Sequence, residues 1–375
     1  INADFDIHVG KVSKIATGLK YSYNDMKYNR LYEYFKNNLW QTINDLSGND
    51  RYTENISAVY FRYTTRFRNN FSLALGLRAE YTYAVPSTNS TMVADKQNYF
   101  SLFPSFNLSM PLNEKQSQMF VLSYNRRIRR PSFWTLVPVR TPISETSYQV
   151  GNPKLQPVFA NDINFSWIFG RKYSLNLGVQ IRKDDIAQVM ERASDNSDII
   201  VFMFKNISNS TQWYANLSLP AQITPWWGMT TNLTGFNMRN TIQDGEKNFR
   251  SGIQANMNNT FTVAKKWYID LSGFYMSKFE FGNMTIDPMY MVNLSFKRSF
   301  WKNRLTASIF VNDIFNTGLQ KVTSSNNGAT TRTVVCNMLR QAGFSIRYNF
   351  KAGKQQKYKR VESGAAEETS RLNAQ

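Results

Sequence analysis

The sequence predicts an all-β protein, an antiparallel transmembrane β-barrel segment of about fourteen strands. Three observations lead to this prediction. Apolar and polar residues alternate with period two over most of the 375 residues. The longest uninterrupted apolar run is Ile199 to Phe204, far short of the roughly 20 residues that a membrane-spanning helix needs. Aromatic residues recur on both sides of one class of short turn.

Composition narrows the class of protein further. Aromatic residues make up 15% of the chain and charged residues only 19%, which is unusual for a cytosolic enzyme. An apolar content of 42% is too high for a disordered protein. The single cysteine excludes a disulfide framework or a cysteine-rich zinc site, and the single histidine, His8, leaves little histidine chemistry. We therefore expect no metal, no cofactor and no enzymatic activity.

Alternation defines the individual strands. In the C-terminal run, Phe344, Ile346 and Tyr348 alternate with polar residues, which indicates one apolar and one polar face. The same pattern recurs in three earlier segments, at 71–81, 163–169 and 173–182. A helical spacing appears only at Tyr28, Leu31, Tyr32, Phe35, Leu39 and Ile43, which predicts a short helix in a loop.

Short and long connections alternate along the chain. The short turns place basic or polar residues between two aromatic or apolar residues, as in Phe67 to Phe71 and Phe169 to Tyr173. Longer polar connections lie between them, at 25–51, 86–98, 131–157, 192–198, 244–248, 282–287 and 316–331. An outer-membrane barrel has this arrangement, with an aromatic girdle and short turns on one rim, long loops on the other, and a polar lumen.

Five stretches carry motifs of a known family, and they occur in the family's order: Leu75 to Thr82 (LGLRAEYT), Leu102 to Ser105 (LFPS), Leu122 to Ser132 (LSYNRRIRRPS) with Gly151 to Pro157 (GNPKLQP), Val311 to Asn316 (VNDIFN) and Ser345 to Phe350 (SIRYNF). Together they resemble the C-terminal barrel of TonB-dependent outer-membrane receptors, in the branch called the outer membrane β-barrel family. One departure is Val158, which stands where that family usually has Glu after the GNPxLxP proline.

The resemblance implies a larger whole. Barrels of that family have about 22 strands, preceded by a plug domain and a TonB box. We therefore expect this chain to be the C-terminal part of such a barrel, with the plug absent from it. A free-standing barrel of about fourteen strands is the competing interpretation.

The resemblance also implies a function and a location. We expect the barrel portion of a TonB-dependent transporter that takes up a scarce, unknown small ligand in an energy-coupled way, in the outer membrane of a Gram-negative bacterium. Expected partners are outer-membrane lipid and lipopolysaccharide, and TonB through the upstream plug and TonB box. A lipoprotein lid is a further partner that the sequence leaves open. The alternatives are a plugless porin-like or fatty-acid-type channel and a β-rich surface adhesin.

The candidate ligand-binding residues are Arg126, Arg127, Arg129 and Arg130, where a strand emerges toward a long loop. Cations at this rim would attract an anionic ligand. They would equally pair with lipopolysaccharide phosphates or solvate the rim. Nucleic-acid binding is not expected despite the net charge of +19, because the basic residues are dispersed and do not form one stripe with stacking aromatics.

Two other features are expected to be non-catalytic. Adjacent residues on a strand point to opposite faces, so Asp184 and Asp185 cannot jointly face a substrate. Cys336 is expected just above the apolar band, without a reactive role.

The organisation that the sequence predicts is a barrel over residues 1–350 and a flexible, basic periplasmic tail over residues 351–375.

Overall fold

The computed structural model describes residues 1–44, 46–67, 69–88, 96–193, 198–206, 209–241, 247–264, 266–281, 284–301, 304–326, 329–335 and 340–350. Cys336 and the predicted tail at 351–375 lie outside these residues. Strands dominate the described part of the chain, as the alternation predicts. Within it, no helix combines the length and the apolar character that crossing a membrane requires.

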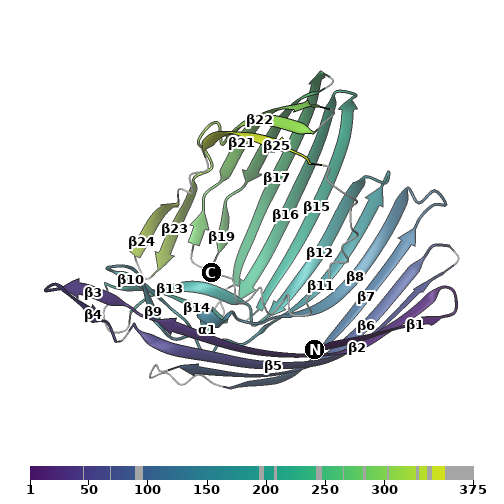
Figure 1. Cartoon of the computed structure of the whole chain (residues 1–375). Coiled ribbons are helices and arrows are strands. Elements are labelled where there is room, and N and C mark those ends of the chain that lie inside the picture. The colour runs from purple at the N-terminus through teal and green to yellow at the C-terminus, as the bar shows by residue number, and fades with distance from the viewer. Residues whose placement is uncertain are drawn as a thin grey trace.

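One antiparallel sheet of fifteen strands forms the main wall of the molecule (Figure 1). Its strands follow one another in chain order: β1 (Asn2–Val9), β2 (Ser13–Arg30), β5 (Gly48–Arg66), β6 (Ser72–Thr88), β7 (Gln97–Pro111), β8 (Gln118–Arg129), β11 (Val158–Phe169), β12 (Tyr173–Lys183), β15 (Asn209–Thr224), β16 (Trp227–Thr241), β17 (Lys247–Ala264), β18 (Trp267–Met276), β21 (Met289–Phe300), β22 (Leu305–Asn312) and β25 (Gln341–Tyr348).

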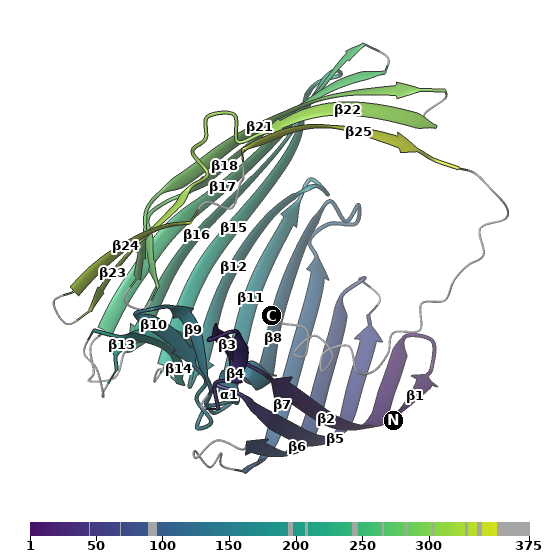
Figure 2. The same cartoon turned by 60° about the vertical axis from the view of Figure 1, so that its left-hand side comes forward.

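The sheet is strongly curved, but among the described residues it does not close. Strands β1 and β25 stand at the two ends of the strand order, and Figure 2 shows the open space between them. The short strand β1, which pairs with β2 from Asn2 to Val9, raises the number of strands above the predicted fourteen. The predicted fold class, an antiparallel barrel segment, is confirmed.

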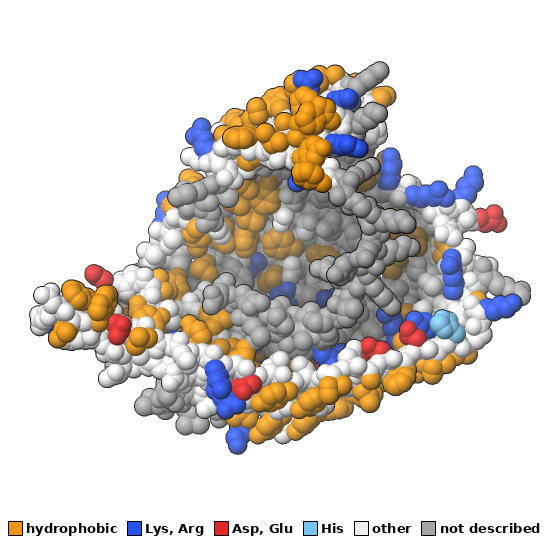
Figure 3. Space-filling model, viewed as in Figure 1, with side chains coloured by type: hydrophobic (Ala, Val, Ile, Leu, Met, Phe, Trp, Pro, Cys, Tyr) orange, Lys and Arg blue, Asp and Glu red, His pale blue; other side chains and the backbone are white. Residues whose placement is uncertain are grey.

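The two faces of the wall differ as the period-two pattern requires. Leu75 and Leu77 on β6 and Leu177 on β12 point outward and are exposed, and so are Phe344 and Ile346 on β25. Figure 3 shows such hydrophobic side chains along the outer edge of β2 and β5, with charged side chains just inside it. An exposed apolar face of this extent suits a lipid environment and not water.

Short turns join neighbouring strands at one rim. At Gly170 and Arg171 the backbone takes φ values of 59° and 62°, which gives the tight turn that suits the twist of a hairpin. The rings of Phe169 and Tyr173, on either side of this turn, lie 5.2 Å apart. Phe67 and Phe71 repeat the arrangement at 5.3 Å. The predicted aromatic rim is therefore present at this end of the wall.

The long connections lie at the other rim and carry secondary structure of their own (Figure 1). The first forms the hairpin β3 (Glu33–Lys36) and β4 (Leu39–Thr42). Two small sheets and a short helix follow: β13-β14-β10-β9, with β9 (Arg140–Ser144), β10 (Ser147–Val150), β13 (Ile186–Arg192) and β14 (Ile200–Asn206); β19-β20-β23-β24, with β19 (Phe279–Phe281), β20 (Met284–Ile286), β23 (Gln320–Asn326) and β24 (Ala329–Val335); and α1 (Phe133–Leu136).

The helix predicted between Tyr28 and Ile43 is wrong. Strand β2 continues to Arg30, and the hairpin β3–β4 replaces the rest of the predicted helix. Asn37 and Asn38 turn this hairpin with φ values of 55° and 59°, and asparagine is among the few residues that adopt this conformation readily. In the hairpin, Phe35 pairs across the two strands with Trp40, which was not part of the helix-like spacing, and their ring centroids lie 5.3 Å apart.

Candidate functional site

The four predicted arginines lie where β8 leaves the main sheet. Arg126 points outward with Leu122, and its guanidinium lies 5.2 Å from the centre of the Phe159 ring. Arg127 and Arg129 point to the inner face, because alternate residues of a strand face opposite sides. Of the three predicted arginines within β8, Arg127 and Arg129 therefore share the inner side of the wall, opposite Arg126.

Both inner arginines contact carboxylates and still reach open space. Arg127 Nε lies 3.3 Å from Asp162 Oδ2 on the neighbouring strand β11, and Arg129 Nη2 donates to Asp185 Oδ1 at 2.8 Å. Their side chains are 68% and 60% exposed. Pairing at such exposed positions is weak, so a second anion can compete for these guanidinium groups.

Arg130 follows the last residue of β8 and behaves differently from the other three. Its side chain is buried, and its guanidinium pairs with Glu80. It also donates to Thr82 Oγ1 at 2.9 Å and to the Tyr99 hydroxyl at 3.1 Å. A continued strand would have turned Arg130 outward with Arg126. The chain instead leaves the sheet at Pro131, and Arg130 turns toward the interior.

Arg130 belongs to a set of four charged side chains, Glu54, Arg78, Glu80 and Arg130, here called the inner charge cluster. Arg78 donates to Glu80 Oε2 through Nε and Nη2, at 2.9 and 2.7 Å. Glu54 lies 3.9 Å from Arg130. Two carboxylates thus face two guanidinium groups, so the buried charges balance.

Polar neighbours complete the inner charge cluster. The Tyr52 hydroxyl donates to Glu54 Oε1 at 3.2 Å, and Asn24 Nδ2 donates to Glu54 Oε2 at 3.2 Å. Burial by itself lowers the pKa of Arg130, but the neighbouring Glu80 and Glu54 carboxylates outweigh it and the pKa is raised. Arg130 is therefore a permanent cation that balances the charge of the Glu54 and Glu80 carboxylates. Without such a partner, a buried carboxylate would cost free energy.

The chain that follows Arg130 folds inward over the cluster. Leu136 of α1 and Leu155 of the GNPKLQP stretch are both almost fully buried, and they pack with Tyr52 and Ala84 of the wall. Gln97 Nε2 donates to the backbone oxygen of Leu155 at 2.8 Å. The predicted polar connection at 131–157 is therefore, in its described residues, an ordered cap on the inner face of β5 to β7.

Asp185 joins the wall to the loop sheet. It accepts hydrogen bonds from Arg129 and from Ser210 at 2.8 Å each, and from Arg182 at 3.3 Å. Its neighbour Asp184 has a φ of 57°, which turns the chain into β13. These contacts make Asp185 a structural hub. Among the described residues, no group of three or more His, Cys, Asp or Glu side chains could hold a metal ion.

Sequence reasoning missed the glutamates of the inner charge cluster. Glu80 and Arg130 lie in two of the resemblance motifs, LGLRAEYT and LSYNRRIRRPS, and pair across 50 residues of sequence. A signal was present, since Glu80 shares the inner phase of β6 with Arg78 and Thr82. The alternation of β8 places Arg130 on the outward face, whereas its side chain turns inward after the strand ends. The pairing of Glu80 with Arg130 could therefore not be inferred from the sequence.

The family model that matches this chain extends over residues 1–348 and is described as the outer membrane protein beta-barrel family. The chain belongs to this family. It is therefore a Gram-negative outer-membrane β-barrel protein, and the rim with long loops faces the outside of the cell. No curated protein matches the sequence.

Several solved structures share the fold. The copper transporter OprC aligns with a TM-score of 0.67 at 14% identity, over 93% of this chain and 56% of its own. The ferric yersiniabactin uptake receptor FyuA from Yersinia pestis aligns at 0.61 and 13% identity, over 93% and 53%. The ferripyoverdine receptor of the outer membrane of Pseudomonas aeruginosa aligns at 0.61 and 13%, over 93% and 47%.

These alignments show the fold, because their sequence identity is low. The main sheet matches part of the barrels of TonB-dependent receptors over most of this chain. The chain spans about half the length of the structures that it matches.

Proposed function

We propose that this chain forms part of the wall of a TonB-dependent transporter that imports a scarce ligand when the inner membrane is energised. One observation carries the proposal: the sheet aligns with such barrels over 93% of the chain, and among the described residues its end strands β1 and β25 each have one unpaired edge. Unpaired backbone groups are not tolerated in lipid. Further strands that join β1 to β25 would complete a barrel of about 22 strands around a plug.

The transported ligand is anionic in this proposal, and Arg127 and Arg129 are the cations that meet it. Both guanidinium groups face the inner side of the wall beside the loop sheet and are more than half exposed. Arg126 faces lipid, where a phosphate of lipopolysaccharide is its natural partner. Arg130 holds the inner cap in place. The barrel performs no catalysis, TonB acts through the plug, and residues 351–375 form a periplasmic tail.

The test measures uptake by a strain with and without the intact gene. Solved structures with this fold include receptors for ferric yersiniabactin and ferric enterobactin, so these two ferric chelates, radiolabelled, are the first probes. We expect accumulation of at least one probe that needs the gene and stops when a protonophore collapses the inner-membrane gradient. The variant R127Q/R129Q should weaken that uptake, while the surface variant K321Q should not.

Conductance separates the transporter from the plugless channel. A transporter with its plug in place should be closed in a planar bilayer, whereas a porin-like channel should conduct at once. Steady conductance together with uptake that persists under the protonophore would overturn the proposal in favour of the channel. Purification of the intact protein in soluble form without detergent would favour the surface adhesin.

A further inference from the structure

The outward face of the wall contains a groove that a strand of ordinary side chains would fill. It lies on β11 to β16 and has a volume of about 540 Å³. Ala215 and Gly235 pair across β15 and β16 and form its floor, because neither has a long side chain. A Cβ added at Gly235 would meet no atom within 4 Å.

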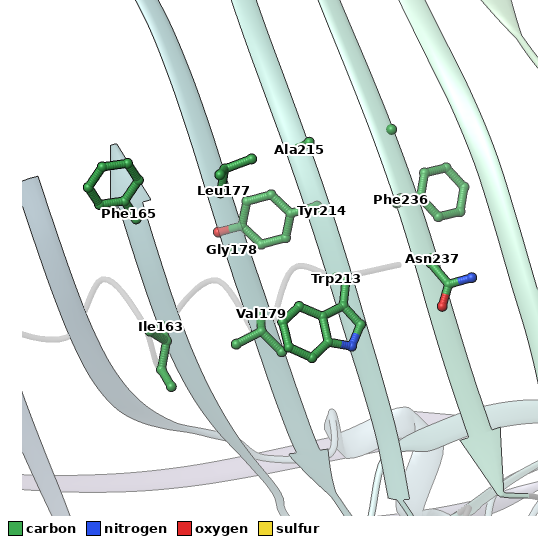
Figure 4. A pocket seen from close by; sticks show the side chains of 11 residues that line it. Ile163, Phe165, Leu177, Gly178, Val179, Trp213, Tyr214, Ala215, Phe236 and Asn237 are labelled. Atoms are coloured by element: carbon green, nitrogen blue, oxygen red, sulfur yellow. The ribbon is translucent and has the colours of Figure 1, made fainter. Parts of the chain in front are cut away.

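The walls of this lipid-facing groove are almost entirely apolar. Figure 4 shows Phe165 and Leu177 on one side and Trp213 on the other, each from a different strand. Trp213 is 59% exposed, although its large ring usually gains from burial. Since the face lies in the membrane, the material that fills the groove is lipid hydrocarbon.

Basic residues stand above the groove on the same outward face. Arg239 is two residues beyond Asn237 of the groove, and so lies about 7 Å closer to the loop rim. Lys183 lies at the loop end of β12, where it pairs in register with Asn209. Arg239 and Lys183 are exposed, and two strand spacings, about 10 Å, separate their strands.

Arg126 extends this basic row across the wall. It lies level with Asn161, Ile181, Thr211 and Arg239 in the strand register, four spacings or about 19 Å from Arg239. Its Nε is buried and has no hydrogen-bond partner. The outward face therefore presents an apolar groove below and a row of cations above, at the outer-leaflet end of the barrel.

We propose that this groove and the row Arg126, Lys183 and Arg239 bind the lipid A part of lipopolysaccharide, with one acyl chain in the groove and the phosphates on the cations. Lipid A carries two phosphates on one headgroup, separated by a disaccharide. A zwitterionic phospholipid carries one phosphate beside its own cation. A row of separated cations therefore selects lipid A. The inference gives a site to the lipid partner proposed above and does not depend on transport.

Native mass spectrometry of the intact protein in mild detergent tests the site. Lipid A and dipalmitoyl phosphatidylethanolamine are titrated in parallel. We expect one lipid A to bind tightly at concentrations where the phospholipid does not. Equal binding of the two lipids would overturn the proposal.

A matched pair of glycine variants tests the groove. G235L should fill the groove and weaken lipid A binding by about tenfold, in the range that overfilling a packed site costs. G273L is the control, because Gly273 also faces outward into open space, beside Met257 and away from the groove. If the two variants bound lipid A equally well, the groove would not be the site.

A matched pair of charge variants tests the cations and does not depend on the glycine variants. K183Q/R239Q should reduce the preference for lipid A over the phospholipid by roughly thirtyfold, for the loss of two charges at the membrane surface. R298Q is the control, since Arg298 is an outward cation at the opposite rim, over the Trp267 and Phe300 rings. An unchanged preference in K183Q/R239Q would overturn the proposal. Lipid binding and ligand uptake are measured in different assays. A failure of the lipid A site can therefore be told apart from a failure of the proposed transport function.

Discussion

The inner face of β5 to β8 and the outer face of β11 to β16 differ in how their space is filled. On the inner face, buried charges and polar groups occupy the space under the cap, and the cluster around Arg130 supplies a partner for each carboxylate. On the outer face, Gly235 leaves space that no described residue fills. Buried charge must be matched within the protein, whereas a gap in a lipid-facing wall can be filled by the membrane.

The largest expected effect removes the cation of the inner charge cluster. Arg130→Ala leaves Glu54 and Glu80 buried with one guanidinium fewer, which should cost about 3 to 5 kcal/mol of unfolding free energy. Urea titration of the heat-modifiable gel band measures this loss. Arg127→Ala is the control, because its exposed ion pair should contribute less than about 1 kcal/mol. Equal losses in the two variants would contradict the contrast between buried and exposed pairs.

The second prediction tests which face meets lipid. Ile346→Arg places a charge on the outward face of β25 and should cost about 2 to 4 kcal/mol near the middle of the bilayer. Ser345→Arg, one residue away on the inner phase, should be tolerated better. The measurement is the yield of folded protein in extracted outer membranes. Similar yields from the two variants would mean that the sheet is not a membrane wall.

Glycine on the two faces should respond differently to a methyl group. At Gly178 an added Cβ would lie 2.2 Å from Tyr214 Cζ, so Gly178→Ala forces the Tyr214 ring to move and should cost about 1 to 3 kcal/mol. Gly235→Ala meets open space and should change the unfolding free energy little. Denaturant midpoints of the two variants compare them directly. A larger loss at Gly235 would reverse the assignment of the faces.

The smallest expected effect concerns the loop hairpin β3–β4. Asn38→Val should cost about 1 to 2 kcal/mol locally, because a β-branched residue resists the φ of 59° found there. Hydrogen exchange of residues 33–42 should become faster in this variant, while the wall strands keep their protection. Asn38→Gly should leave the exchange unchanged. Faster exchange of β2 and β5 as well would show that the hairpin supports the wall.

The sequence by itself determined the wall. Alternation at Leu75, Leu177 and Ile346 gives both the strand and its outward face, because side chains on a strand alternate whatever the rest of the fold does. The aromatic short turns indicate the rim, and the order of the motifs indicates the family. Both are patterns within short stretches of sequence, so they can be recognised without the tertiary structure. The hairpin at Asn37 and Asn38 shows where the local pattern fails: an apolar spacing typical of a helix occurs in a segment that folds as two paired strands, stabilised by the cross-strand contact of Phe35 with Trp40.

Only the tertiary structure decided what the charged residues do. The four neighbouring arginines face lipid, interior space or a buried carboxylate, because strand phase separates the first three and the departure of the chain at Pro131 redirects Arg130. The pairing of Glu80 with Arg130, and the groove at Gly235, each depend on strands that are distant in sequence. Such contacts follow from register and curvature, which residue spacing alone does not specify.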